Sequence, residues 1–442
     1  MNNQSVFRDF SKYVSLNILG QMAFSCYTLA DTFFVSAKLG TNGLTALNLA
    51  FPIFCLINGT GLMLGMGGGT KYSINRSRNA EKQANSVFTN AIYLVVVFAA
   101  LFVFAGLFFS ESIARLLGAD DTVFTMTNVY LKVMMLFAPA FLTNNLLQCF
   151  VRNDGKPSLS MAAMITGSLS NVVLDYIFIF PCNMGIFGAI FATGLAPIIS
   201  IIVLSTYFIK RKNNFHFIKA YPCIKNLCGI LSSGVSPFLT EITSGIVMFL
   251  FNYIILHIVG NVGVAAFGII TVISLVVVAV YTGLSQGVQP IISQNYGAGN
   301  SKNTKTILKY AMVTMLLLSG IIYSIIYFGA PVLTAIFNSE GNTELSVFAI
   351  RGLKLYFISC PFVGCNIVLA TYFISTEKPI FAQIISMLRG FVILIPMAFL
   401  LSSILKMTCV WCAYPVTEII VSIVAILLFL RNKRNSLQAT EL

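Results

Sequence analysis

Charged residues are scarce in this chain of 442 residues. Only 9% are Asp, Glu, Lys or Arg, whereas a water-soluble domain carries about 25%. Hydrophobic residues make up 57% of the sequence, and the mean hydropathy is +0.87. This balance excludes a water-soluble globular protein and predicts a polytopic membrane protein.

Three further absences narrow the function. There are only two histidines, His216 and His257, and neither lies near the paired cysteines, so no zinc set and no hydrolytic constellation can be assembled. We therefore expect no enzymatic activity. No loop is long enough for an attached nucleotide-hydrolysing domain. The glycine-rich run ending at Lys71 lacks the glycine that a phosphate loop needs before its lysine; its glycines, four residues apart, instead predict close helix packing.

Apolar segments of about 20 residues recur twelve times, and each is long enough to cross a ~30 Å hydrocarbon core as a helix. We therefore predict an all-α membrane protein with twelve transmembrane helices. The first segment carries Asp31 and follows Arg8 and Asp9, so we expect no cleavable signal peptide. The expected spans are 16–38, 47–69, 88–109, 129–150, 159–180, 185–209, 227–258, 264–286, 309–331, 353–374, 381–402 and 408–430.

The distribution of basic residues predicts the orientation. If both termini are cytoplasmic, 21 of the 27 lysines and arginines lie in inner segments, as the positive-inside tendency requires. We expect a multi-pass protein of the plasma membrane with both termini inside. The net charge of +13 then reflects membrane orientation, and it requires no nucleic-acid partner.

Short matches between the two halves indicate an internal duplication, although chance recurrence of loop residues is the alternative. We expect an N-terminal six-helix lobe (1–209), a cytoplasmic linker (210–226) and a C-terminal six-helix lobe (227–442). The matches are Gly61-Leu62-x-x-Gly65 with Gly283-Leu284-x-x-Gly287 and Lys156-Pro157 with Lys378-Pro379, both 222 residues apart, and Gly40-x-x-Gly43-x-x-Ala46 with Gly260-x-x-Gly263-x-x-Ala266, 220 residues apart.

Acidic residues inside the expected spans mark the candidate site, because each costs ~2.5–3.5 kcal/mol or more to place in the middle of the bilayer. Counting ~1.5 Å per residue places three polar groups in the outer half of the first lobe: Asp31, Asp175 and Thr193. Asn171 lies one turn from Asp175, and Tyr27 lies one turn from Asp31. We expect these side chains to converge.

A cluster of this kind has two chemical uses. Oxygen ligands with net negative charge suit Na⁺, in which case Asp31, Asn171, Asp175 and Thr193 would be the metal ligands. Alternatively, two carboxylates that share a poorly solvated site can carry a proton. The third interpretation is a polar cluster with only a structural role.

The second lobe contributes two more acids near mid-membrane, Glu241 and Glu418. Together with Tyr27 they are candidates for the wall of a substrate cavity that attracts cationic compounds, although local hydrogen bonds could hold them instead. Arg389 is a weaker candidate partner for these acids, because its long side chain can extend to the inner surface.

These residues give the chain a resemblance to the multidrug and toxic compound extrusion (MATE) family over essentially its whole length. The matching segments are Leu29 to Val35, leading to Leu39-Gly40; Arg152 to Pro157; and Gly287 to Gly299. In that family, a cation site in the first lobe uses an Asp on helix one, an Asn and an Asp four residues apart on helix five, and a Thr on helix six. The residues here that match these positions are Asp31, Asn171, Asp175 and Thr193. The resemblance implies a V-shaped pair of lobes that extrudes drugs in exchange for Na⁺ or H⁺. Some members also carry acids on the tenth helix, but 353–374 has none.

We therefore expect a monomeric secondary antiporter that exports organic cations or drugs across the lipid bilayer by alternating access, with no cofactor beyond the coupling ion. The alternative is a lipid-linked saccharide flippase of related fold, which basic residues in the cavity would favour; we expect acids to dominate there. A receptor or channel fits a doubled chain with buried acids less well. A major facilitator-like fold lacks support, because its charged loop motif after the second helix is missing.

Overall fold

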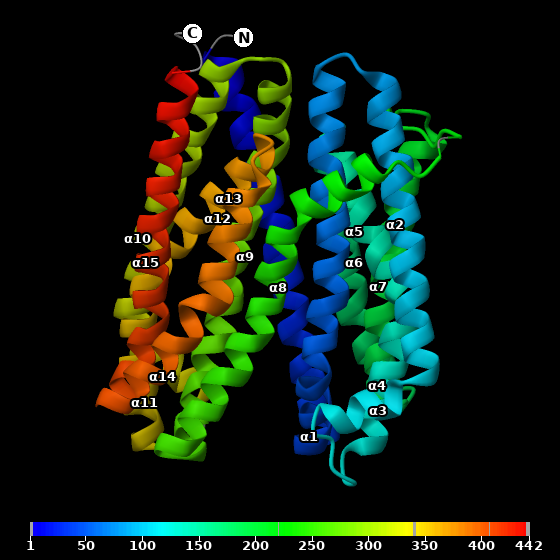
Figure 1. Ribbon diagram of the computed structural model, residues 1–442. Helices are drawn as coiled ribbons and strands as arrows, with labels where there is room; N and C mark the ends of the chain where they lie inside the picture. Colours follow the sequence, from blue (N-terminus) through cyan, green and yellow to red (C-terminus); the bar gives the residue numbers. More distant parts are fainter. Residues whose placement is uncertain (1–2, 220, 339–341, 406, 439–442) are drawn as a thin grey trace.

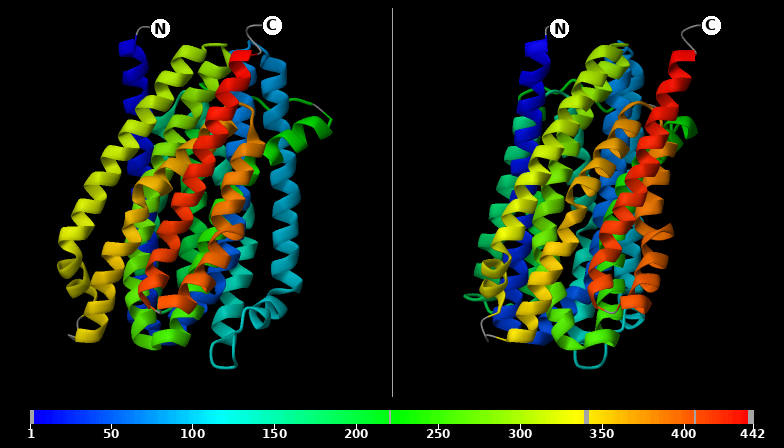
Figure 2. Two further views of the ribbon diagram at one scale, coloured as in Figure 1. Left: turned by 60° about the vertical axis from the view of Figure 1, so that its left-hand side comes forward. Right: turned by 90° about the vertical axis from the view of Figure 1, so that its left-hand side faces the viewer.

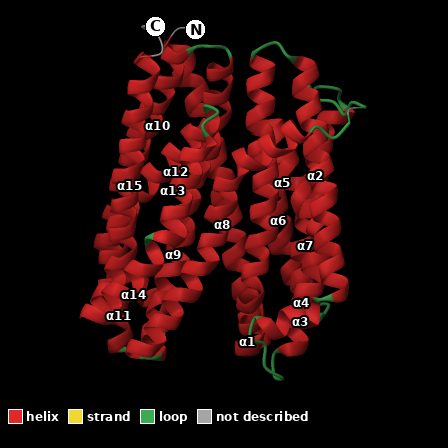
Figure 3. Cartoon of the chain, viewed as in Figure 1, coloured by secondary structure: helices red, strands yellow, loops and turns green. Residues whose placement is uncertain are grey.

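The computed structural model describes residues 3–219, 221–338, 342–405 and 407–438, and the regular structure in these ranges is entirely helical (Figure 3). The first part of the chain forms α1 (Asn3–Ser77), α2 (Glu81–Phe108), α3 (Ser110–Leu116), α4 (Phe124–Leu136), α5 (Ala138–Asn153), α6 (Pro157–Ile179) and α7 (Gly185–Ile209). The second part forms α8 (Ile224–Val259), α9 (Asn261–Gly297), α10 (Ser301–Phe337), α11 (Thr343–Tyr356), η1 (Phe357–Ser359), α12 (Cys360–Ser375), α13 (Pro379–Met387), η2 (Leu388–Val392), α14 (Leu394–Leu405) and α15 (Met407–Gln438).

The described helices account for the twelve predicted crossings. Ten helical segments are long and apolar enough to span a membrane, and α4 with α5, bent by 47° at their junction, forms an eleventh span. The twelfth comes from α1, whose 75 residues contain a non-helical residue, Gly40, at φ 64° and ψ −152°. A straight helix of that length would measure about 110 Å, so α1 is two spans, residues 3–39 and 41–77.

The spans form two lobes that stand side by side (Figure 1). Lobe one contains α1 to α7, and lobe two contains α8 to α15. Both the start of α1 and the end of α15 lie at one end of the bundle, which we call the terminal face (Figure 2); the other end is the opposite face. The hydrophobic core of lobe two takes in Phe10 and Tyr13 from the start of α1, while a core of lobe one takes in Ile230 from α8. Each lobe therefore receives the beginning of the other lobe's first helix.

Backbone geometry confirms the internal duplication. Gly260, which ends α8, has φ 78° and ψ −157°, nearly the values of Gly40 in α1. Lys156 has φ −121° and ψ 59° before α6, and Lys378 has φ −120° and ψ 54° before α13. The same turns therefore recur at corresponding places in both lobes.

One of the three sequence matches is out of register. Residues 41–77 of α1 and Asn261–Gly297 of α9 both follow the turn glycine and have the same length, so they correspond at an offset of 220 rather than 222. Gly287 therefore corresponds to Gly67 and not to Gly65. Both of these glycines meet the other lobe's first helix: a Cβ atom at Gly67 would overlap the carbonyl oxygen of Ile230, and one at Gly287 would lie 2.8 Å from that of Tyr13.

The glycine-rich end of α1 packs against α5, as its spacing predicts. A Cβ atom at Gly61 or Gly65 would lie 2.7 Å from an atom of Asn145, and one at Gly69 would lie 2.7 Å from the side chain of Asn153. These distances leave no room for a side chain. The glycines thus allow the close approach of α1 and α5, whose facing residues line the cavity described below.

Polar contacts join the lobes near the terminal face. Glu377 of lobe two forms ion pairs with Lys71 at 3.5 Å and Arg78 at 2.8 Å. Deeper in the bundle, Gln289 of α9 donates to the Thr70 hydroxyl at 2.9 Å and exchanges hydrogen bonds with Asn153. The described state is therefore closed between the lobes on the side of the terminal face.

The connection between the lobes is fastened to lobe one. The backbone amide of Asn214 donates to Asp154 Oδ2 at 2.9 Å, and that of Cys223 donates to Asn90 Oδ1 at 2.9 Å. The next helix, α8, begins at Ile224, three residues before the predicted span.

Candidate substrate cavity and cation site

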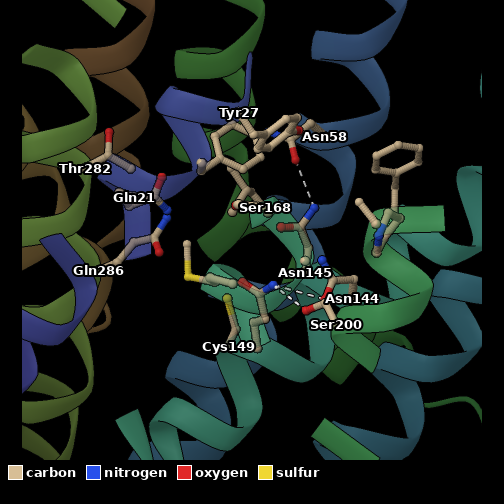
Figure 4. A pocket seen from close by; sticks show the side chains of 18 of the residues that line it. Gln21, Tyr27, Asn58, Asn144, Asn145, Cys149, Ser168, Ser200, Thr282 and Gln286 are labelled. Atoms are coloured by element: carbon tan, nitrogen blue, oxygen red, sulfur yellow. Dashed lines mark hydrogen bonds between the residues drawn. The ribbon is translucent and has the colours of Figure 1, made fainter. Parts of the chain in front are cut away.

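A polar cavity lies between α1, α5, α6 and α7 of lobe one and α8 and α9 of lobe two (Figure 4). Its apolar wall includes Phe24, Tyr27, Phe54, Phe141 and Met164. The uncharged polar side chains are mostly amides, which can both donate and accept hydrogen bonds: Gln21, Asn58, Asn144, Asn145, Gln148 and Gln286. Such a mixture suits organic molecules that are largely apolar and carry a few polar groups.

Two predicted cavity residues, Tyr27 and Glu241, line this cavity. Glu241 lies on α8, four residues after Pro237. A chain of amides from lobe one holds its carboxylate: Asn145 Nδ2 donates to Asn58 Oδ1 at 3.0 Å (Figure 4), and Asn58 Nδ2 donates to Glu241 Oε2 at 3.2 Å. The amides fix the position of Glu241 without neutralising its charge.

The four predicted cation-site residues of lobe one are all buried, with side chains 0–6% exposed. Two of them, Asn171 and Asp175, lie one turn apart on α6; Asp31 comes from α1, and Thr193 comes from α7. When the Asn171 amide is oriented so that its donors face acceptors, its nitrogen donates to Asp175 Oδ2 at 2.9 Å and its oxygen accepts from the Thr193 backbone amide at 3.3 Å. The helical spacing therefore brings three of the four residues into contact.

The cluster contains carboxylate oxygens that could bind a cation. Oδ1 of Asp31 and Oδ1 of Asp175 are buried and have no hydrogen-bond partner among the described residues, and the two carboxylates lie close enough to interact electrostatically. Unpaired buried acids are costly. A bound Na⁺ or a shared proton would relieve that cost, so the residues present fit either coupling ion.

Two tyrosines border these carboxylates. Tyr27 interacts electrostatically with both acids and also lines the cavity, so it lies between the two sites. Tyr130 of α4 is 6% exposed and also interacts with both acids. Sequence reasoning missed Tyr130, because nothing in the local pattern of α4 distinguishes an inward tyrosine from a lipid-facing one.

Glu418 lies outside the cavity lining, in a compact cluster within lobe two. Arg389 Nε donates to Glu418 Oε1 at 2.5 Å, and Asn366 Nδ2 donates to Oε2 at 2.8 Å. Arg389 also donates to the Tyr414 hydroxyl at 3.2 Å. The structure thus corrects the expectation for Arg389: its side chain is only 8% exposed and does not extend to the surface, because a buried acid nearby needs a counter-ion.

The expectation that acids dominate the cavity is wrong. Among the described residues the cavity wall contains one acid, Glu241, and one base, Arg152. The predicted span 129–150 left Arg152 outside the membrane, among the basic residues of the inner segments, but α5 extends to Asn153 and the arginine is 1% exposed. The available signal was its position only two residues after the end of the predicted span 129–150.

A duplicated bundle of twelve crossings, with a polar cavity where its two lobes meet, defines the class: a membrane transporter. The MatE family model matches residues 17–177 and 238–400, which is most of the chain. The protein belongs to the multidrug and toxic compound extrusion (MATE) family.

Similar proteins agree with this assignment. Two relatives are the multidrug export proteins MepA of Staphylococcus saprophyticus, 26% identical over 99% of this chain and 97% of that protein, and of Staphylococcus aureus, 25% identical over 99% and 96%. Among solved structures, an outward-facing multidrug resistance MATE transporter superposes with a TM-score of 0.91, at 22% identity over 98% and 96% of the two chains. A MOP superfamily transporter from Pyrococcus furiosus gives 0.90, at 23% identity over 97% and 96%.

Proposed function

We propose that this protein is a secondary antiporter of the plasma membrane that exports organic cations or drugs in exchange for H⁺ or Na⁺. The observation that supports antiport most directly is the pair of buried carboxylates, Asp31 and Asp175. Each has an oxygen without a hydrogen-bond partner among the described residues, and Tyr27, which interacts with both, lines the cavity between the lobes. The names of the MepA relatives support multidrug export.

The transport cycle would follow from the position of Tyr27. A cation that binds Asp31 and Asp175 adds positive charge directly behind the tyrosine wall of the cavity. That charge repels a cationic substrate, so ion binding and substrate binding oppose each other, which is the thermodynamic requirement for exchange. Alternating access would require the polar contacts at the terminal face to open.

Orientation and assembly are parts of the same proposal. We place the terminal face in the cytoplasm, because the expected inner segments carry most of the basic residues, and the state closed on that side is then outward-facing. The lobes 1–209 and 227–442 would move as units about the linker 210–226 in a monomer.

The flippase alternative is favoured by Arg152 and opposed by Glu241. A lipid-linked saccharide carries its sugar on a phosphate or diphosphate group, and the described cavity wall offers one cation to it. The carboxylate of Glu241 would repel the same group. The cavity therefore fits organic cations better than a phosphate-bearing lipid.

The test is transport by the full-length protein in proteoliposomes, with a Na⁺ gradient and a pH gradient imposed separately. We expect a lipophilic cation to be driven outward by one of the two gradients. Movement that requires ATP, or that ignores both gradients, would overturn the antiport mechanism.

A further inference from the structure

The linker between the lobes carries positive charge and no negative charge. Residues 210–228, which take in the linker and the first turn of α8, contain no Asp or Glu. The five basic side chains of this segment are all exposed, and within the described part of the chain none of them forms an ion pair. They are Lys210, Arg211, Lys212, Lys219 and Lys225.

The same segment exposes large apolar side chains. Phe217 is 57% exposed, Tyr221 95% and Ile224 77%. Water solvates lysines well and these apolar groups poorly, whereas the boundary between lipid headgroups and acyl chains favours both kinds of side chain. We call the exposed set formed by Phe217, Lys219, Tyr221, Ile224 and Lys225 the linker face.

An aromatic anchor holds the linker against lobe one. Phe215 is fully buried, and its ring lies with centroid distances of 4.7 Å from Phe88, 5.6 Å from Phe150 and 5.8 Å from Tyr72. Burial of a phenylalanine stabilises a contact by about 1.5–3 kcal/mol. The linker is therefore a docked segment, although it has no regular secondary structure.

Side chains of α2 fix the backbone that follows this anchor. Asn85 Oδ1 accepts a hydrogen bond from the His216 amide at 2.9 Å, and the Thr89 hydroxyl accepts one from the Ile218 amide at 3.1 Å. Phe217, which lies between these two bonded residues, remains on the exposed side. The linker face is thus presented by a backbone that is bonded to lobe one from beneath.

The linker lies beside lobe one and not over its end. Figures 1 and 2 show it projecting sideways from the bundle, while the tip of the hairpin between α1 and α2 extends further toward the terminal face. A segment that projects sideways near one end of a membrane-spanning bundle lies against the surrounding lipid headgroups. Anionic headgroups complement its charge.

We propose that the linker face binds anionic phospholipids in the leaflet at the terminal face. The ammonium groups of Lys219 and Lys225 contact the lipid phosphates, while Phe217, Tyr221 and Ile224 lie at the top of the acyl chains. Phosphatidylcholine has no net charge, so this surface selects lipids such as phosphatidylglycerol. Because the linker is bonded to α2, a bound lipid fastens lobe one to that leaflet.

The test is contact quenching by brominated lipids. The one tryptophan of the sequence, Trp411, is buried in lobe two, so Trp411→Phe combined with Tyr221→Trp gives a full-length protein whose fluorescence reports on the linker face. If Trp411→Phe lowers the folded yield, Tyr221→Trp alone serves after the emission of the wild type is subtracted. The protein is reconstituted in vesicles of phosphatidylcholine and phosphatidylglycerol, with bromine near the top of the acyl chains of one lipid at a time.

We expect the linker face to prefer phosphatidylglycerol about tenfold over phosphatidylcholine at low salt, the scale on which one or two lysines meet an anionic surface. High salt should reduce the preference. Equal quenching by the two lipids overturns the proposal. Quenching by neither lipid also overturns it, because the introduced tryptophan would then lie in water and the face would be left for a soluble partner. No ion gradient and no drug are needed, so the result is independent of the transport mechanism.

Charge-removing variants separate a site from the general charge of the terminal face. Lys219→Gln with Lys225→Gln, in the reporter protein, should lower the preference to about twofold or less. The matched control is Lys302→Gln with Lys305→Gln, which removes two exposed charges from the first turns of α10 in lobe two and should leave the preference unchanged. Equal losses in the two double variants, or no loss in either, would show that the linker face is not the binding site.

Discussion

The two lobes have the same helix arrangement, but they differ in where buried charged residues lie and in how those charges are paired. In lobe one, Gly167 of α6 packs against Ala196 of α7, with a Cβ atom only 3.1 Å from the carbonyl oxygen. The positions 222 residues later carry Arg389 and Glu418, which form the ion pair of lobe two. Both pairs are separated by 29 residues. The same helix contact is therefore made by two small residues in one lobe and by a buried salt bridge in the other.

At the candidate cation site, the polar and charged side chains lie in lobe one instead of lobe two. The turn glycines relate Asp31 to Phe251 at an offset of 220, and the Lys-Pro turns relate Asn171 to Ile393 and Asp175 to Met397 at an offset of 222. Lobe two thus has apolar side chains where lobe one has the residues of the candidate cation site. Phe251 is fully buried in the core of lobe two.

This difference separates two roles for a buried acid. Glu418 has a counter-ion and an amide donor, so its charge is balanced inside lobe two and it has no need of a mobile ion. Asp31 and Asp175 each keep an oxygen without a partner in the described part of the chain, which is why we propose that a mobile ion balances their charge. Under this proposal, ion coupling would be confined to lobe one, while the ion pair of lobe two would have a structural role.

The largest effect should come from removing the unbalanced acids. Asp31→Asn and Asp175→Asn should each abolish gradient-driven transport, because an amide can neither carry a proton nor hold Na⁺ with a full charge. The measurement is transport in proteoliposomes alongside the amount of folded protein recovered. Asp121→Asn, at an exposed carboxylate that pairs with Arg115, serves as the control. Normal transport by both variants would show that coupling lies elsewhere.

The next effect should fall on stability in lobe two. Arg389→Met leaves Glu418 buried and unpaired and should lower the free energy of unfolding by about 3–5 kcal/mol, measured by unfolding in detergent. The double variant Arg389→Met with Glu418→Gln should recover most of the loss, since no charge then remains unpaired. If the single and double variants are equally unstable, the ion pair is not what balances lobe two.

Much of this architecture could be predicted from the sequence, because it depends on local signals. Twelve apolar runs predicted twelve crossings, and the four-residue spacing of Asn171 and Asp175 predicted a shared face. Partners across helices have no such local signal. The pairing of Glu418 with Arg389 depends on how α13 to α15 pack around the π-helical turn η2, and the inward direction of Arg152 depends on where α5 ends. The glycine match failed for a related reason: identical residues two positions apart point to different sides of a helix.

A smaller effect is expected at Glu241, the acid that faces both lobes. Glu241→Gln keeps an acceptor for Asn58 and removes the charge, so a cationic ligand should bind about 10- to 100-fold more weakly while a neutral analogue is unchanged. Equilibrium binding of the matched pair measures this. Gln21→Glu offers the opposite test, because Gln21 corresponds to Glu241 at the offset of 220 and also lines the cavity; it should strengthen cation binding. Equal losses for both ligands in Glu241→Gln would make the residue structural.

The smallest effect concerns the contact that closes the terminal face. Glu377 has a positive φ of 57°, and the corresponding residue of lobe one is Gly155 with φ 91°, so only lobe two reaches across with a carboxylate. Glu377→Gln should weaken closure by about 0.2–1 kcal/mol, since exposed ion pairs contribute little, and added salt should reduce the difference. Distances between spin labels at Gln83 and Lys302, in a background without exposed cysteines, would measure the closed fraction. An unchanged fraction at low salt would mean that the hydrogen bonds of Gln289 and Asn153 close this face without help from Glu377.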